Sequence, residues 1–265
     1  AVTTFSGVGT IASAGDLNGD GVGDIMTNTF VVFGQSGGWS ATPNLGTLDG
    51  TDGLRLDGLS DHATATFSIG DTDINGDGID DLVVGDYQAD KVHVVFGTTT
   101  GFDPTLDLAT LDGTDGFSLT GAPGDHAGIS VSGAGDVNGD GIEDLIIGAR
   151  FAEDTGAAYL VFGSDTGFDA EIDLGALDGT DGFVFVGESA VDLVGDSVAG
   201  PGDIDGDGYD DLVIGAPTVD IDGIMNVGKT YVVFGGPNLA LFDADDGSLD
   251  GRIELGGLGA SDLLL

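Results

Sequence analysis

Residues 136–144 read Asp-Val-Asn-Gly-Asp-Gly-Ile-Glu-Asp, and the same pattern occurs three more times along the chain. It reads Asp-Leu-Asn-Gly-Asp-Gly-Val-Gly-Asp at 16–24, Asp-Ile-Asn-Gly-Asp-Gly-Ile-Asp-Asp at 73–81, and Asp-Ile-Asp-Gly-Asp-Gly-Tyr-Asp-Asp at 203–211. We number these stretches loops 1 to 4 in chain order. A motif that recurs at such similar intervals indicates a protein built from four structural repeats.

Each loop carries oxygen-bearing side chains at positions 1, 3, 5 and 9, and Ca²⁺ takes roughly six to eight oxygen ligands. The residue type at position 7 varies, which suits a backbone carbonyl ligand. Glycine at position 6 allows the sharp turn that brings these oxygens together. We therefore predict one Ca²⁺ in each loop, about four ions in all. The predicted ligands are Asp16, Asn18, Asp20, Val22, Asp24, Asp73, Asn75, Asp77, Ile79, Asp81, Asp136, Asn138, Asp140, Ile142, Asp144, Asp203, Asp205, Asp207, Tyr209 and Asp211.

Two other interpretations of the loops are weaker. An EF-hand needs a glutamate at position 12 and helices on both sides, whereas position 12 is occupied by Thr27, Val84, Ile147 and Ile214. Clusters of Asp, Asn and Gly also form turns without any metal. Four loops with the same ligand positions favour metal binding over turn formation alone. Mg²⁺ fits less well than Ca²⁺, because it resists dehydration and requires strict octahedral geometry.

The segments between the loops predict short β-strands. A Val-Val-Phe-Gly or similar stretch ends at Phe33, Phe96, Phe162 and Phe234, and its separation from the preceding loop increases from repeat 1 to repeat 4. Length variation at one place marks a surface hairpin loop. The glycine of a Leu-Asp-Gly triplet follows each of these phenylalanines at the same sequence separation, at Gly50, Gly113, Gly179 and Gly251.

Each unit reads as four strands, rich in β-branched and aromatic residues and bounded by Gly and Asp. Repeated four-stranded units are typical of propeller blades. We predict one all-β domain over residues 1–265, a β-propeller of four-stranded antiparallel blades. The four visible repeats cover approximately 1–57, 58–121, 122–187 and 188–265.

Charge and cysteine content narrow the classes of partner. The chain has 47 acidic and five basic residues and a formal net charge of −42. Phosphate groups would be repelled, so nucleic acid is excluded as a partner, and anionic membrane surfaces are disfavoured. Divalent cations are favoured instead. The chain has no cysteine, so disulfides cannot stabilise the fold and bound metal is the natural alternative. No apolar run is long enough to predict a membrane span.

These residues resemble the FG-GAP repeat of the integrin α-chain β-propeller and of its secreted bacterial relatives. The resemblance rests on Gly128-Ile-Ser-Val before loop 3 and Gly148-Ala-Arg after it, and on Gly195-Asp-Ser-Val before loop 4 and Gly215-Ala-Pro after it. It implies an extracellular, calcium-binding scaffold for cell adhesion or protein recognition, secreted or at the cell surface. The expected partner is a protein or glycan ligand at the cell exterior. The family's propeller usually has more blades than the four repeats seen here.

Catalysis is not expected. His62 and His126 share the context Asp-His-Ala one repeat apart, and His93 lies within an alternating strand, so structural roles are favoured for all three. No nucleophile elbow, zinc-protease motif or phosphate-binding loop is present. Trp39, Phe102 and Phe168 occupy equivalent places in three repeats, which favours packing over ligand binding.

Two alternatives to the adhesion scaffold stay open. The first is a carbohydrate-binding module or accessory domain of a secreted polysaccharide-active enzyme. The second is a structural subunit of an extracellular assembly that self-associates through incomplete blades. The apolar segment 263–265 favours the second, because an exposed terminal strand can pair with another chain.

Overall fold

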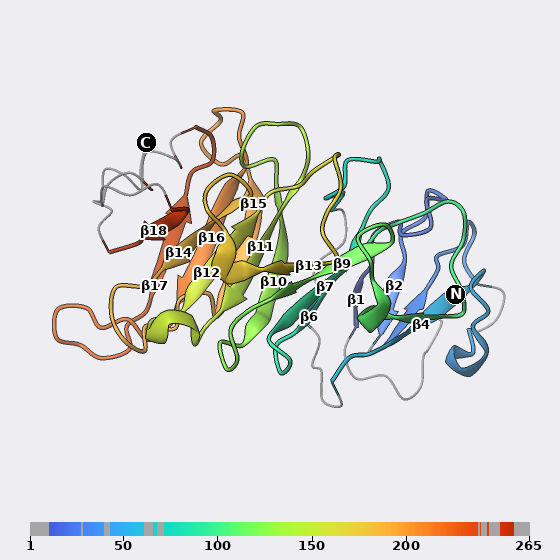
Figure 1. Ribbon diagram of the computed structural model, residues 1–265, viewed down its shortest axis with the longest axis horizontal. Coiled ribbons are helices and arrows are strands. Elements are labelled where there is room, and N and C mark those ends of the chain that lie inside the picture. Colours follow the sequence, from blue (N-terminus) through green and yellow to red (C-terminus); the bar gives the residue numbers. More distant parts are fainter. Residues whose placement is uncertain are drawn as a thin grey trace.

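The computed structural model describes residues 11–27, 29–39, 43–60, 66–67, 72–237, 239, 243 and 250–256. This part of the chain consists of β-strands with short 3₁₀ helices between them and almost no α-helix (Figure 1). The expectation of an all-β protein is therefore confirmed. Among the described residues, no helix has the length and apolar character needed to span a membrane. His62 and residues 263–265 lie outside the described ranges.

Within the described ranges the strands form four sheets, which we number in chain order. Sheet 1 contains β1 (Ile11–Ser13), β2 (Ile25–Thr27), β3 (Phe30–Val32), β4 (Gly53–Asp57) and β8 (Thr105–Asp107). Sheet 2 contains β5 (Thr66–Phe67), β6 (Leu82–Asp86), β7 (Lys91–Val95), β9 (Gly116–Thr120) and β13 (Glu171–Asp173). Sheet 3 contains β10 (Ala127–Gly135), β11 (Asp144–Ala149), β12 (Ala157–Val161), β14 (Gly182–Val186) and β18 (Arg252–Glu254). Sheet 4 contains β15 (Ser197–Gly202), β16 (Asp211–Ala216) and β17 (Lys229–Val233). The 3₁₀ helices are η1 (Leu45–Thr47), η2 (Leu108–Thr110), η3 (Ala152–Asp154) and η4 (Leu174–Ala176).

The first three sheets differ from the predicted four-stranded antiparallel blades. Four strands of each do pair antiparallel in chain order, but a fifth strand from the following repeat joins the outer edge in parallel. The added strands are β8 on β4, β13 on β9 and β18 on β14. Each of them is so short that an alternating pattern cannot identify it from sequence. These three sheets are therefore mixed, and each of them is linked to the following repeat by the one strand that this repeat contributes.

This pairing also corrects one repeat landmark. Ser118 N–H donates to the carbonyl of Ala170, just before β13, and Val184 N–H donates to the carbonyl of Gly251, just before β18. Gly251 is therefore the structural counterpart of Ala170, and its place in a Leu-Asp-Gly triplet does not make it equivalent to Gly179. The constant spacing from Phe234 therefore indicated an equivalence that the hydrogen bond of Gly251 does not support.

The hydrophobic core lies between neighbouring sheets. One cluster, including Met26, Leu54 and Val84, joins sheets 1 and 2. A second and larger one, including Val94, Phe117 and Ile147, joins sheets 2 and 3, and a third joins sheets 3 and 4. The central strands are buried on both faces, which explains the continuous apolar runs that follow each loop. Figure 1 shows sheet 1 at one end of the described part of the molecule, sheet 2 beside it, and sheets 3 and 4 overlapping in this view at the other end.

The variable-length hairpin of the sequence lies where it was predicted. In sheet 1, β2 ends at Thr27 and β3 begins at Phe30, whereas residues 217–228 separate β16 from β17 in sheet 4. The long loop is at the surface, because Ile224 and Met225 are 66% and 76% exposed. The insertions therefore extend into solvent and leave the sheets unchanged.

Candidate metal-binding loops

Each loop connects the first two strands of a sheet. Loop 3, for example, lies between β10 and β11, and loop 4 between β15 and β16. The described elements on either side of the loops are strands, as predicted from the sequence. An EF-hand loop would have a helix on each side. The four motifs therefore occupy equivalent places in the fold.

The aspartate at position 1 holds the loop in shape. In loop 3, Asp136 Oδ1 accepts hydrogen bonds from the amides of Gly139 and Asp140 at 2.7 and 3.0 Å, and Oδ2 accepts one from Gly141 at 2.9 Å. In loops 1, 2 and 4 the position-1 aspartate likewise accepts from the amides at positions 5 and 6. The chain is thus wrapped around one carboxylate, with the side chains at positions 3 and 5 on the same turn.

The aspartate at position 9 is buried and joins the loop to the third strand of its sheet. Asp144 Oδ2 accepts from Val137 N–H at 3.0 Å, and Oδ1 accepts from Gly163 N–H, just after β12, at 2.9 Å. Asp24, Asp81 and Asp211 each make the same two contacts in their own repeats. Burial raises the pKa of Asp24, Asp81 and Asp144 to about 7, against the backbone hydrogen bonds that lower it.

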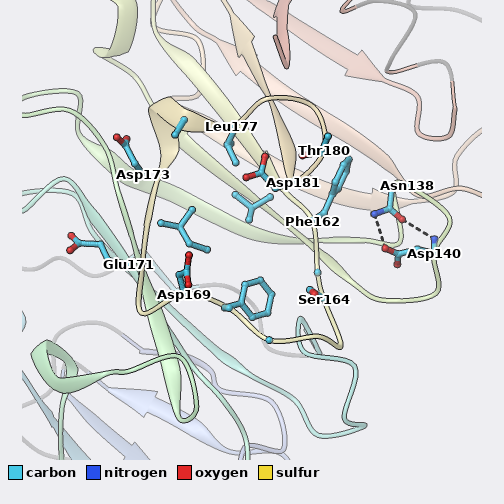
Figure 2. A pocket seen from close by; sticks show the side chains of 16 residues that line it. Asn138, Asp140, Phe162, Ser164, Asp169, Glu171, Asp173, Leu177, Thr180 and Asp181 are labelled. Carbon is cyan, nitrogen blue, oxygen red and sulfur yellow. Dashed lines mark hydrogen bonds between the residues drawn. The ribbon is translucent and has the colours of Figure 1, made fainter. Parts of the chain in front are cut away.

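Carboxylate oxygens converge most clearly in loop 4. One oxygen from each of Asp203, Asp205 and Asp211 lies within 4.8 Å of the other two. Loop 4 has Asp205 where loops 1 to 3 have asparagine. In loop 3 that asparagine, Asn138, donates to Asp140 Oδ2 at 3.0 Å and accepts from the Asp140 amide at 2.8 Å (Figure 2). Positions 3 and 5 are therefore in direct contact, as a shared ligand shell requires.

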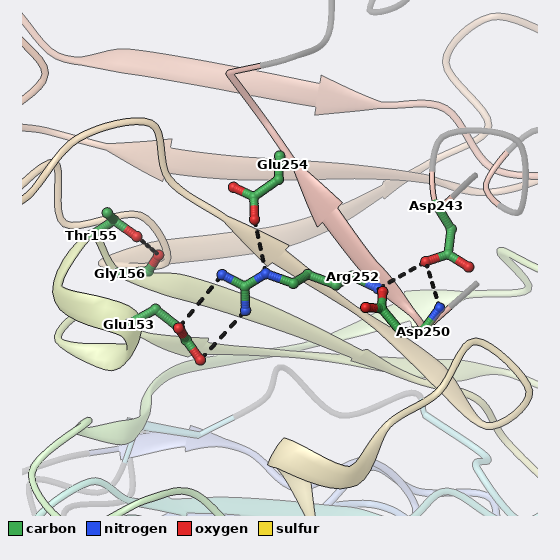
Figure 3. Close-up of polar contacts among 7 residues, drawn as sticks. All are labelled: Glu153, Thr155, Gly156, Asp243, Asp250, Arg252 and Glu254. Atoms are coloured by element: carbon green, nitrogen blue, oxygen red, sulfur yellow. Dashed lines mark hydrogen bonds and ion pairs between the residues drawn. The ribbon is translucent and has the colours of Figure 1, made fainter. Parts of the chain in front are cut away.

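The five basic side chains all pair with acids outside the loops. Arg55 contacts Asp57, Lys91 contacts Glu171, Arg150 contacts Asp196, Lys229 contacts Glu188, and Arg252 contacts Glu153 and Glu254. Figure 3 shows Arg252 held between its two partners. Within the described part of the chain, no lysine or arginine therefore neutralises the loop carboxylates, and an external cation is the remaining counter-charge. Their all-oxygen donor set suits a hard cation such as Ca²⁺.

Comparison with known proteins identifies a repeat family in the second half of the chain. Residues 127–161 and 194–233, which contain loops 3 and 4, match the FG-GAP repeat family. The chain is 27% identical to integrin alpha pat-2 of Caenorhabditis elegans over 94% of its own length, and 31% identical to integrin alpha-5 of Xenopus laevis over 65%. This chain carries FG-GAP repeats and is homologous to integrin α chains. It spans 21% and 17% of these two relatives, so it corresponds to a small part of each.

Loops 2 and 3 border surface pockets. A pocket of about 470 Å³ lies beside loop 3 and is lined by Asn138, Asp140, Phe162 and Phe168 among others (Figure 2). The equivalent pocket beside loop 2 measures about 450 Å³. Phe168 stacks on Phe117 with ring centroids 4.2 Å apart, which confirms its packing role.

The other two aromatic residues of this set also contact the protein interior. Phe102 packs against Phe33 with ring centroids 5.8 Å apart. Trp39 donates from its indole nitrogen to the Phe33 carbonyl at 3.1 Å. Phe102 and Phe168 therefore pack against the phenylalanine that follows the third strand of the preceding repeat, whereas Trp39 contacts the equivalent phenylalanine of its own repeat.

The described histidines lie in packed surroundings. His93, in β7, is 5% exposed and its Nδ1 lies 2.9 Å from Ser118 Oγ. His126 lies between the rings of Tyr87 and Phe151, with centroid distances of 5.4 and 4.8 Å. These contacts support the structural roles predicted for both residues.

Burial gives His93 a measurable effect on stability. Desolvation lowers the pKa of His93 from 6.5 to about 4. Between these pH values the unfolded chain binds a proton at this residue and the folded chain does not, so the contribution of His93 to folding stability falls as the pH falls. The loss reaches about 3 kcal/mol near pH 4. Urea unfolding of the wild type and of His93→Gln at several pH values measures it. We expect the stability of the wild type relative to the variant to fall as the pH is lowered, and an offset that is independent of pH would contradict the prediction.

Sequence reasoning missed position 8 of the loops, where three of the four repeats have an acid. These residues are Asp80, Glu143 and Asp210, and the first loop has Gly23. Position 8 was not assigned a role because it falls outside the alternating ligand pattern. Its contacts lie in a different repeat, as described below.

Proposed function

We propose that this chain is a calcium-stabilised, extracellular scaffold for cell adhesion or protein recognition. Its homology to integrin α chains supports the adhesion role. The observation that carries the proposal is the set of four oxygen-lined loops whose acids have no basic partner among the described side chains. The proposed location is the cell surface or the secreted fraction, where calcium is abundant.

In each loop, the side chains at positions 1, 3, 5 and 9 and the backbone carbonyl at position 7 would hold one Ca²⁺. Positions 1 and 9 come from the two ends of the loop, which are continuous with the first and second strands. Position 9 also reaches the turn after the third strand. A bound ion would therefore fix three strands of one sheet relative to one another. Its role here is structural, and it supplies counter-charge and geometry rather than chemistry.

We further propose that the sheets are blades of a β-propeller. Their side-by-side packing through apolar faces supports this arrangement, and so does the presence of FG-GAP repeats. The loops then lie on one rim, and the long hairpins lie at the surface. A ring could close within one chain or between several chains. Sedimentation at several protein concentrations distinguishes the two, because it measures whether the chain self-associates.

Isothermal titration of calcium into metal-free protein tests the ion content of the proposal. We expect about four sites, and a result of no binding at millimolar calcium would overturn it. Adhesion is tested separately by coating beads with the protein and measuring their capture by immobilised extracellular-matrix proteins. Capture in calcium that is lost in chelator supports the scaffold. If the protein instead binds glycans on an array and none of the matrix proteins, the carbohydrate-binding alternative is favoured.

A further inference from the structure

The acid at position 8 of loops 2, 3 and 4 contacts the preceding loop in the chain. Asp80 Oδ2, in loop 2, accepts a hydrogen bond from the Asp16 amide of loop 1 at 2.7 Å. Asp210 Oδ2, in loop 4, accepts one from the Asp136 amide of loop 3 at 2.8 Å. Glu143, in loop 3, accepts one from the Asp73 amide of loop 2 at 3.2 Å. In every case the donor is the backbone of position 1, the residue around which the loop is wrapped.

The residue before position 1 is shaped to admit this carboxylate. Gly15 and Gly135 have φ values of +66° and +72°, a left-handed conformation that favours glycine. A Cβ at Gly135 would lie 2.1 Å from Asp210 Oδ2, and a Cβ at Gly15 would lie 2.7 Å from Asp80 Oδ2. Loop 2 has Thr72 at this place, and there the acceptor is the longer glutamate side chain. The shorter acid, aspartate, thus approaches glycine in two pairs, and the longer acid, glutamate, approaches threonine in the third.

A second contact joins the same pairs of repeats. The residue two places after the Val-Val-Phe phenylalanine donates its N–H to the position-2 carbonyl of the preceding loop. The three bonds are Thr98 to Leu17 at 2.9 Å, Ser164 to Ile74 at 2.9 Å, and Gly236 to Val137 at 2.7 Å. Positions 1 and 2 of loops 1 to 3 are therefore both held by the following repeat.

We propose that Asp80, Glu143 and Asp210 are positioning residues that couple each cation site to the site in the preceding repeat. The inference rests on the proposed calcium binding. Position 8 is covalently next to the position-9 ligand of its own loop, so an ion bound there fixes the position-8 side chain. That side chain then holds the backbone of position 1 in the preceding loop, where both carboxylate oxygens already order the turn. Binding at one loop thereby favours binding at the loop before it, and the coupling is reciprocal.

A calcium titration with one reporter for each loop tests the coupling. The amide signals of Gly21, Gly78, Gly141 and Gly208, at position 6, serve as these reporters in NMR spectra of the full chain. In Asp210→Ala we expect the calcium midpoint at Gly141 to rise about five- to tenfold, because a hydrogen bond to a charged group is lost. The midpoint at Gly208, in the mutated loop itself, should change less. In Asp80→Ala the larger shift should move to Gly21.

Two controls separate hydrogen bonding from charge. Asp210→Asn removes the charge but keeps an oxygen acceptor, so its effect at Gly141 should be smaller than that of Asp210→Ala. Asp169→Ala removes an exposed carboxylate from the pocket beside loop 3, and it should leave the ratio of the two midpoints unchanged. A shift confined to the mutated loop, or an unchanged midpoint at Gly141, would overturn the proposal.

A measurement without metal separates this inference from calcium binding itself. In chelator, hydrogen exchange at the Asp136 amide should be faster in Asp210→Ala than in the wild type, because its acceptor is gone. Unchanged exchange would refute the contact on which the coupling depends. If exchange does increase but no loop of the wild type titrates with calcium, the contact stands while the proposed function fails.

Discussion

Removing calcium is expected to lower the thermal unfolding midpoint of this protein by at least about 10 °C, since in a chain of this size 1 kcal/mol corresponds to roughly 2–4 °C. A ligand at a hundred times its dissociation constant stabilises the folded state by about 2.7 kcal/mol for each site. The loops contain thirteen ligand carboxylates, three in each of loops 1 to 3 and four in loop 4. Without a cation these acids repel one another, so we expect calcium removal to cause a large loss of folding stability.

Calorimetry in calcium at about 1 mM and in excess EGTA measures this shift. Magnesium at the same ionic strength is the control, since screening of the surface charge alone would act with either ion. A midpoint that is unchanged by chelation would contradict the assignment of the loops as calcium sites. Equal stabilisation by magnesium would contradict the choice of ion.

Asp144→Ala is expected to destabilise the folded state by about 3–5 kcal/mol even in chelator. The substitution leaves two buried N–H groups without their acceptor, and each such loss costs about 1–3 kcal/mol. The Asp144 carboxylate is fully buried and accepts hydrogen bonds from the amides of Val137 and Gly163. The substitution also separates the loop from the turn that follows β12. Denaturant unfolding in EGTA measures the change in the free energy of unfolding.

Asp140→Ala is the matched control in the same loop. Asp140 is exposed and its carboxylate accepts from the Ile142 amide at 2.9 Å. In chelator we expect a loss below about 1 kcal/mol, as for other exposed substitutions. In calcium both variants should lose the stabilisation given by the loop-3 site. Similar losses for the two variants in chelator would show that position 9 has no role beyond metal binding.

The local part of the architecture could be predicted because short-range patterns encode it. The spacing of oxygen-bearing residues defined the loops, and the apolar runs after them defined the central strands, which are buried on both faces. Repetition strengthened both predictions, since the same pattern occurs four times. The hairpin insertions were placed correctly for the same reason, because only one segment of the repeat varies in length.

The predictions failed where a contact joins two repeats. The parallel strands β8, β13 and β18 are very short, and each belongs to the sheet of the preceding repeat. The assignment of Gly251 failed with them, since its role follows from that pairing. The burial of His93 likewise depends on the packing around β7, and its alternating strand pattern fits either a buried or an exposed face.

By itself, the sequence determined the four acidic loops, the strands on either side of them and the repeat that relates them. These features depend on residues that are close along the chain, where spacing fixes geometry. Only the tertiary structure decided which repeat each position-8 acid serves and which sheet each fifth strand joins. The hydrogen bonds made by Asp80, Glu143 and Asp210 join residues 64, 70 and 74 positions apart. Such contacts are set by how neighbouring sheets pack, which the local pattern does not specify.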